Sequence, residues 1–174
     1  MKKHPGFTLI ETLFAVLLFT TSLVALMAIS GRGNASTATS REELTARMLA
    51  LEGIEAARNI RDRNFGTNQP WDDGLAANPD CSGGCDVEYV SGAPTLTTNQ
   101  GPLYRNLSNY QYGLNPNGGE LTPYTRTVTV TPGSNASELR VESEVSWFSR
   151  GRQRNIRYQS YLMRWRNTSV PTAP

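Results

Sequence analysis

Hydrophobic residues are concentrated near the start of the chain, where one apolar stretch runs from Phe7 to Ile29. As a helix, these 23 residues would be about 35 Å long, which exceeds the roughly 30 Å hydrocarbon core of a bilayer. Glu11 is the one charged residue within the stretch. A carboxylate costs on the order of 2.5–3.5 kcal/mol at the centre of a membrane helix and less towards its ends. The pattern therefore predicts a membrane-spanning helix over 7–29 in which Glu11 needs compensation.

A helical pattern resumes after this stretch and predicts a second half of the helix over 30–64. The run 30–34 contains two glycines, which predict an interruption or a bend because glycine costs about 1 kcal/mol each against alanine. Ser40 and Glu43 match a capping box, an N-terminal helix signature. Apolar residues then recur at spacings of three and four, and they predict the face that packs on a sheet: Leu44, Met48, Leu51, Ile54 and Ala57.

The last third of the chain alternates apolar and polar residues with a period of two, which predicts three strands at 124–130, 139–148 and 156–163. Turns at 132–135 and 150–152 separate them. The predicted inward-facing residues are Val128, Val130, Leu139, Val141, Val145, Trp147, Ile156, Tyr158, Ser160 and Leu162. This pattern predicts an antiparallel meander with one buried face. The fold class is therefore α+β, with a long N-terminal helix packed on the sheet of a domain over 65–174.

Residues 66–123 contain many Gly, Pro and Asn residues and resist assignment. Short apolar pieces at 87–90 and 110–114 are candidates for paired strands. Loops often carry recognition, so any adhesive or docking surface is expected in this region. Its aromatic residues can line such a surface or fill the small core, and the core is the favoured role for Trp71, Tyr89, Tyr104, Tyr110 and Tyr112.

Cys81 and Cys85 are the only cysteines, and two of the three residues between them are glycines. In an oxidising compartment we expect a disulfide, because the glycines give the short loop the freedom that closure needs. Two free thiols are the alternative. Two cysteines are too few for a structural zinc site, and their spacing is not C-x-x-C, so neither a metal nor a redox role is expected.

Charge and composition argue against several function classes. Lys2 and Lys3 are the only lysines, and His4 is the only histidine. Beyond residue 6 the chain carries 15 Arg against 15 Asp and Glu, so its net charge gives no indication of nucleic-acid binding. The sequence contains no nucleophile motif, and its acidic residues are scattered. We therefore expect no catalytic site, no cofactor and no metal.

The residues Gly6-Phe7-Thr8-Leu9-Ile10-Glu11 resemble the processing motif of type IV prepilins and type II secretion pseudopilins. The resemblance implies that a prepilin peptidase cuts between Gly6 and Phe7, removes residues 1–6 as a leader, and methylates the new amine of Phe7. It also implies that Glu11 pairs with the Phe7 amine of a neighbouring subunit. Such a pair compensates a carboxylate in the span. Residues 144–165 are likewise similar to the closing hairpin of minor pilins, and the predicted architecture is pilin-like.

The resemblance implies a structural subunit, of the minor-pilin type, in a type IV pilus-like filament. The expected partners are other pilin subunits, prepilin peptidase, an assembly platform in the inner membrane, and the lipid bilayer before assembly. Lys2 and Lys3 favour a cytoplasmic N-terminus. The expected location is thus the inner membrane, with a single pass, and later a periplasmic or cell-surface filament.

Several alternatives remain open. The chain could be a pseudopilin of a type II secretion or DNA-uptake machine, or a membrane-anchored binding domain that never polymerises. The first thirty residues also fit a plain signal anchor, in which Glu11 reaches back to the cytoplasmic interface. A secretory signal peptide fits less well, because its apolar region is 7–15 residues long and ends in a small-residue cleavage site.

Overall fold

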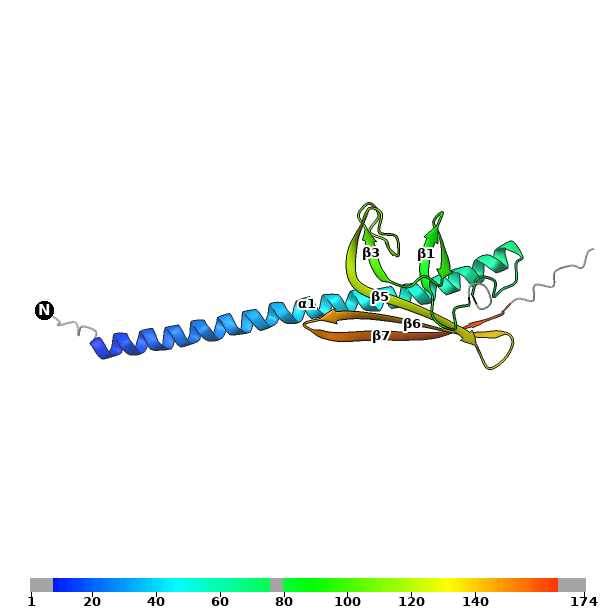
Figure 1. Cartoon of the computed structure of the whole chain (residues 1–174). Coiled ribbons are helices and arrows are strands. Elements are labelled where there is room, and N and C mark those ends of the chain that lie inside the picture. Colours follow the sequence, from blue (N-terminus) through cyan, green and yellow to red (C-terminus); the bar gives the residue numbers. More distant parts are fainter. Residues whose placement is uncertain (1–7, 76–79, 166–174) are drawn as a thin grey trace, which may run out of the picture. The chain divides into compact units, whose positions relative to one another are not determined.

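The computed structural model describes residues 8–75 and 80–165, which form one helix and seven strands (Figure 1). The helix is α1 (Leu9–Thr67). The strands are β1 (Asp86–Val90), β2 (Ala93–Thr97), β3 (Pro102–Asn106), β4 (Tyr112–Gly113), β5 (Gly119–Pro132), β6 (Glu138–Ser149) and β7 (Arg152–Met163). The chain divides into two units, one up to Glu42 and one from Glu43 onward, and α1 contributes to both. The α+β class is confirmed.

Helix α1 is continuous across the two segments where the sequence predicted a break. Residues 30–34 are helical, and so is Ser40, so the predicted interruption and the predicted cap at Ser40 are both wrong. Two glycines cost about 1 kcal/mol each, which is less than the loss of several consecutive backbone hydrogen bonds. The helix ends at Thr67, three residues beyond the predicted end.

The five-stranded antiparallel sheet has the strand order β4-β3-β5-β6-β7, which confirms the meander predicted for its last three strands. In β5–β6 the register pairs Val130 with Val141, and in β6–β7 it pairs Val145 with Ile156. Arg150 and Gly151 connect β6 to β7 with φ of 51° and 74°, as a two-residue type I′ turn requires. Strand β5 is longer than predicted, because its first half pairs with β3 and only its second half lies in the meander.

The part of α1 in the second unit packs on the sheet through small side chains. Ala46, Ala50, Gly53 and Ala57 are buried, and a Cβ at Gly53 would lie 3.0 Å from Val128 Cγ2 and closer still to Ser143 Oγ. The absence of that Cβ lets the helix approach the sheet closely.

The predicted packing face is therefore wrong in its first half and correct in its second. Leu44, Met48 and Leu51 are 55%, 63% and 47% exposed, whereas Ile54 and Ala57 are buried. The prediction relied on the large apolar residues, whereas the close approach of the helix to the sheet requires small residues at the contact.

Buried apolar side chains form two clusters between α1 and the sheet. One contains Ile54, Ile60, Leu75, the two cysteines, Val128, Val141 and Leu162 among others. The other contains Ala46, Leu49, Ala50, Leu103, Tyr124, Val145 and Trp147. The inward-facing residues predicted for β5 and β6 are all buried, and in β7 the same alternation ends in a buried Leu162.

The region that resisted assignment contributes two small strand pairs. Strands β1 and β2 form a two-stranded antiparallel sheet, and β3 and β4 pair at the edge of the large sheet. The two predicted strand pieces are thus strands or overlap one, but they belong to different sheets. In Figure 1 the β1 and β3 segments are both drawn on the same side of β5.

Candidate functional site

The apolar N-terminal stretch satisfies its hydroxyl groups internally. Thr12, Thr20, Thr21 and Ser22 each donate a hydrogen bond to a backbone carbonyl three or four residues earlier, at 2.7–3.0 Å. In contrast, the carboxylate of Glu11 has no hydrogen bond or ion pair with any residue in 8–75 or 80–165. Its side chain is the polar group of this stretch for which the described part of the chain supplies no counter-charge.

The same stretch has the length and composition of a membrane span. An 18-residue window of α1 has a mean hydropathy of 2.3, and its side chains are exposed. Among the described residues this is the one helix long and apolar enough to cross a membrane, which is consistent with a single-pass protein. The processing residues Gly6 and Phe7 lie outside the described residues.

Glu11 also has a local role that the sequence reasoning missed. The Glu11 amide donates a 3.4 Å hydrogen bond to Thr8 Oγ1, which places Thr8 at the N-cap of α1. Thr8-x-x-Glu11 is the capping-box spacing that was instead noted at Ser40 and Glu43. A negative charge in the first turn is also favourable towards the helix dipole. The spacing itself was the signal that could have identified this cap.

A buried charged cluster joins α1 to both sheets; we call Arg126, Asp86, Glu52 and Tyr89 the Arg126 cluster. Arg126 Nε lies 2.6 Å from Asp86 Oδ1, and Arg126 Nη1 lies 2.9 Å from Glu52 Oε2. The Tyr89 hydroxyl donates a 2.6 Å hydrogen bond to Glu52 Oε1. Arg126 and Asp86 are fully buried. A buried guanidinium is tolerated when such partners surround it.

The electrostatics of the Arg126 cluster favour retention of protons. Two carboxylates face one guanidinium. The pKa of Asp86 is raised, mainly by burial and also by the charge of Glu52. The Arg126 guanidinium acts in the opposite direction but does not cancel the effect of burial. Burial and the hydrogen bond to Glu52 also raise the pKa of Tyr89. The hydroxyl of Tyr89 thus stays protonated and fixed on the Glu52 carboxylate.

The two cysteines form a disulfide in the structure, with their Cα atoms 5.1 Å apart. Both are buried in the first core cluster. The backbone of Cys85 exchanges two hydrogen bonds with Val128, at 2.7 and 2.6 Å, so the disulfide loop lies along β5 beyond the point where β3 ends. Gly84 has a φ of +102°, and a Cβ there would lie 2.7 Å from Thr127 Cγ2. The loop therefore places Asp86, the next residue after Cys85, at the start of β1.

A cleft of about 230 Å³ lies between β1 and the loop that joins β3 to β4; we call it the tyrosine cleft. Its aromatic lining consists of Tyr89, Tyr104 and Tyr112. Its polar lining consists of one carboxylate, Glu88, and the amide side chains of Asn106, Asn109, Gln111 and Asn115. Gly113 and Leu114 complete the wall.

The five aromatic candidates from the sequence thus have three different positions. Trp71 is buried in the core, and Tyr110 is exposed at the tip of the β3–β4 loop. The remaining three tyrosines line the cleft, where each is half-buried. Tyr89 and Tyr112 also pack against the two core clusters, as the favoured core role predicted. Their grouping depends on strand pairings that had no clear signal in the sequence.

The described residues contain no group of three or more His, Cys, Asp or Glu side chains that could hold a metal ion. In comparisons with known proteins, the chain matches no family model, no curated protein and no solved structure.

Proposed function

We propose that this chain is a structural subunit, of the minor-pilin type, in a type IV pilus-like filament that assembles through its N-terminal helix. The processing motif around Gly6 and Phe7 supports this proposal, and so does the candidate membrane helix near the N-terminus. Glu11, whose carboxylate has no partner among residues 8–75 and 80–165, is the fifth residue after the proposed cleavage site, and this location supports the proposal as well.

The observation that carries the proposal is the exposed apolar face of α1 in the second unit. Leu44, Met48 and Leu51 are exposed although the helix packs on the sheet beside them. A bilayer accounts for about 20 residues of helix, which covers the stretch up to Ile29 but not these positions. Exposed apolar groups at helical spacing mark a contact surface. In a filament, helices of neighbouring subunits would cover this face.

Assembly follows from the N-terminal chemistry. Cleavage after Gly6 by a prepilin peptidase creates the Phe7 amine, which is then methylated. The amine of one subunit meets Glu11 of the next, and each carboxylate gains a cation as it leaves the lipid. The subunit waits in the inner membrane with a single pass until the assembly platform transfers it to the filament.

The test compares substitutions at two similarly exposed apolar residues, one on the proposed contact face of α1 and the other on β6. Met48→Glu should strongly reduce the amount of full-length protein in sheared filaments, measured by mass spectrometry at matched expression. The control, Phe148→Glu, changes a similarly exposed residue of β6 and should incorporate like the parent protein. Normal incorporation of Met48→Glu, or absence of the parent protein from filaments, would contradict the proposal. The location of the filament, on the cell surface or within the periplasm, separates a pilus from a secretion pseudopilus.

A further inference from the structure

We propose that the tyrosine cleft binds a neutral carbohydrate. This site is independent of the proposed filament, because every residue that lines it belongs to 88–115 and none to the apolar stretch of α1.

The aromatic wall provides stacking surfaces for a sugar ring. Tyr104 comes from β3, Tyr112 from β4 and Tyr89 from β1, and all three border the cleft. Tyr104 is paired with Gly113 and Tyr112 with Arg105, so the two rings lie on opposite faces of the β3–β4 pair. The hydroxyls of Tyr104 and Tyr112 have no hydrogen-bond partner in residues 8–75 and 80–165. Aromatic faces carry partial negative charge, so they attract the C–H groups on the apolar face of a sugar ring.

The ring of Tyr89 is held in place by a hydrogen bond from its hydroxyl group. Its hydroxyl donates to Glu52, which in turn accepts from the buried Arg126 guanidinium at 2.9 Å. A ring held in this way loses little further freedom when a ligand stacks on it, so the cost of binding is reduced. The Arg126 cluster thus also limits the motion of one side chain that lines the cleft, Tyr89.

The amide groups provide the hydrogen bonds that sugar hydroxyls need. Asn106 Oδ1 accepts from the amides of Ser108 and Asn109, and Asn109 Oδ1 accepts from the amide of Gln111, at 2.8–3.3 Å. These bonds hold the β3–β4 loop in shape. Within the described residues, the side-chain nitrogens of Asn106 and Gln111 donate no hydrogen bond and are available to a ligand. Side-chain amides both donate and accept, which matches the hydroxyl group.

Charge and size narrow the ligand class. Glu88 is the one carboxylate in the wall, and no Arg or Lys lines the cleft, so an anionic ligand is disfavoured. A quaternary ammonium would use the aromatic rings and Glu88 but has no acceptor for the side-chain nitrogens of Asn106 and Gln111. A neutral sugar uses both kinds of group. The volume of about 230 Å³ is below the roughly 300–1,000 Å³ of clefts for drug-sized ligands, which suits a single ring or the end of a glycan.

The experiment uses the full-length protein in nanodiscs of phosphatidylglycerol and phosphatidylethanolamine. Glycoside detergents are avoided because their sugar heads would compete, and choline lipids are avoided for the same reason. Glucose, galactose, mannose and N-acetylglucosamine are tested one at a time by saturation-transfer NMR, with choline as the cationic comparator. We expect millimolar binding of at least one sugar and no binding of choline.

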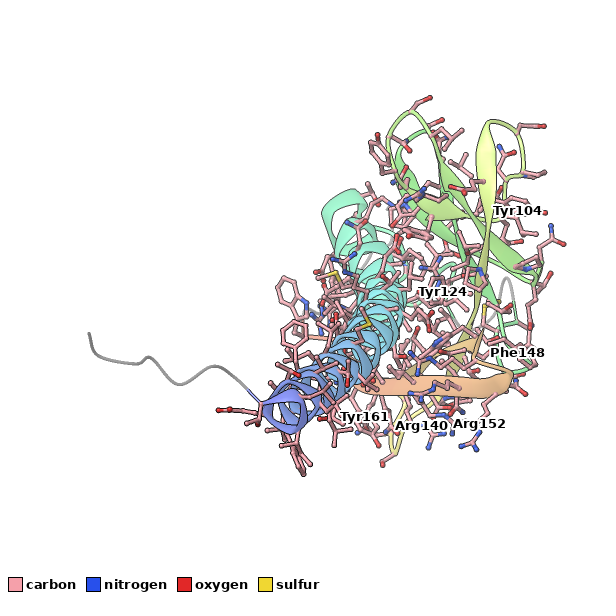
Figure 2. The ribbon with its side chains drawn as sticks, turned by 90° about the vertical axis from the view of Figure 1, so that its left-hand side faces the viewer. Tyr104, Tyr124, Arg140, Phe148, Arg152 and Tyr161 are labelled. Atoms are coloured by element: carbon pink, nitrogen blue, oxygen red, sulfur yellow. A yellow bond between two sulfur atoms is a disulfide. The ribbon has the colours of Figure 1, made fainter. Side chains whose placement is uncertain are left out.

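Substitutions locate the site. Tyr104→Ala and Gln111→Ala should each weaken that binding at least tenfold, whereas Tyr104→Phe keeps the ring and should retain most of it. Tyr161→Ala is the matched control, because Tyr161 is an exposed tyrosine of β7, well separated from Tyr104 in Figure 2. The proposal is overturned if no sugar binds, if choline binds in their place, or if Tyr104→Ala, folded by circular dichroism, binds as tightly as the Tyr161→Ala control.

Discussion

Arg126 and Glu11 are both charged side chains among apolar neighbours, but only Arg126 has its counter-ions within the described chain. Its guanidinium contacts Asp86 and Glu52 at 2.6 and 2.9 Å, and these three residues come from β5, β1 and α1. Glu11 has no such partner in the described residues. Apart from Thr8 and Thr12, its neighbours along α1 are apolar side chains, among them the exposed Ile10 and Phe14.

The difference distinguishes a folded domain from a segment that depends on its surroundings. A domain core pairs its buried charges internally, because an uncompensated charge there costs several kcal/mol. A helix that is apolar all round buries no face within the described chain, so its compensation comes from outside it. Five predictions sharpen this contrast, ordered by their expected effect on the free energy of unfolding of the domain.

Arg126→Met should have the largest effect. It leaves Asp86 and Glu52 beside each other without a cation, and breaking a buried pair in this way costs about 3–5 kcal/mol. Urea unfolding followed by circular dichroism measures the loss. Arg157→Met is the matched control, since Arg157 also contacts two carboxylates, Glu142 and Glu144, but is 56% exposed. The control should unfold at the parent's midpoint, and an equal shift in both variants would contradict the role of burial.

Removal of the disulfide should rank second. The double variant Cys81→Ala/Cys85→Ala is expected to lose about 2–3 kcal/mol at most, because a short loop restricts the unfolded chain only slightly. Since Cys85 precedes Asp86, part of this loss reflects a less well placed carboxylate in the Arg126 cluster. Alkylation of the unfolded parent protein without reductant checks the premise by mass spectrometry. Two labelled thiols would show that the disulfide is absent.

Gly53→Ala tests the close approach that brings Glu52 to Arg126. The added Cβ would meet Val128 and Ser143, and overpacking of this kind costs about 1–3 kcal/mol. Gly66→Ala is the control within the same helix, because a Cβ at Gly66 has no atom within 4 Å. Alanine favours the helix there, so the control should be unchanged or more stable by up to about 1 kcal/mol. Equal destabilisation of both variants would rule out the contact with the sheet as the cause.

Tyr89→Phe tests proton retention in the Arg126 cluster. The pKa of Tyr89 is raised in the folded state, so above about pH 10 the unfolded chain releases a proton that the folded chain keeps. The contribution of Tyr89 to stability is thus fully present below that pH and is lost as the pH rises further. The variant should start about 1 kcal/mol less stable, because Glu52 loses a hydrogen bond, and the two stability curves should converge above pH 10. Parallel curves from pH 8 to 11 in urea unfolding would contradict the raised pKa.

The meander could be predicted from sequence because each of its strands is long and alternates regularly. The same alternation contained a signal for the Arg126 cluster. Arg126 has the same parity as Val128 and Val130, so it faces inward with them. A long charged residue on an inward position predicts buried partners, although the pattern does not identify them.

The partners and the cleft could not be predicted, because they depend on contacts between distant, short elements. Asp86 reaches Arg126 across 40 positions of sequence. Tyr104 and Tyr112 are brought to the same cleft by a strand pair of only two registered positions. Strands of two to five residues carry too few alternations to be recognised. The prediction of the buried helix face failed for a different reason. Small residues such as Ala46 and Ala50 give no strong hydrophobic signal, yet they lie where the helix approaches the sheet most closely.

Glu11→Val should have no effect on the unfolding of the domain, and this is what makes it informative. The carboxylate lies in the first turn of α1, in the unit that ends at Glu42, and so it is not part of the unit whose unfolding is measured. Removal of a charge from the apolar stretch also lowers the cost of membrane insertion, so membrane-bound protein should be maintained or increased. If Glu11 pairs with the Phe7 amine of a neighbour, incorporation into sheared filaments should nevertheless fall sharply.

Two further variants separate the pair from the local roles of Glu11. Thr8→Val removes the side-chain cap of α1 but keeps the carboxylate, and it should assemble like the parent if capping is not the function of Glu11. Glu11→Asp retains the charge on a shorter side chain and should restore part of the assembly that Glu11→Val loses. Intact mass after membrane extraction establishes whether each variant is cleaved between Gly6 and Phe7, so that a processing defect is not mistaken for an assembly defect. Normal incorporation of cleaved Glu11→Val would mean that the carboxylate only reaches the aqueous interface, and the contrast with Arg126 would then be one between a solvated charge and a paired one.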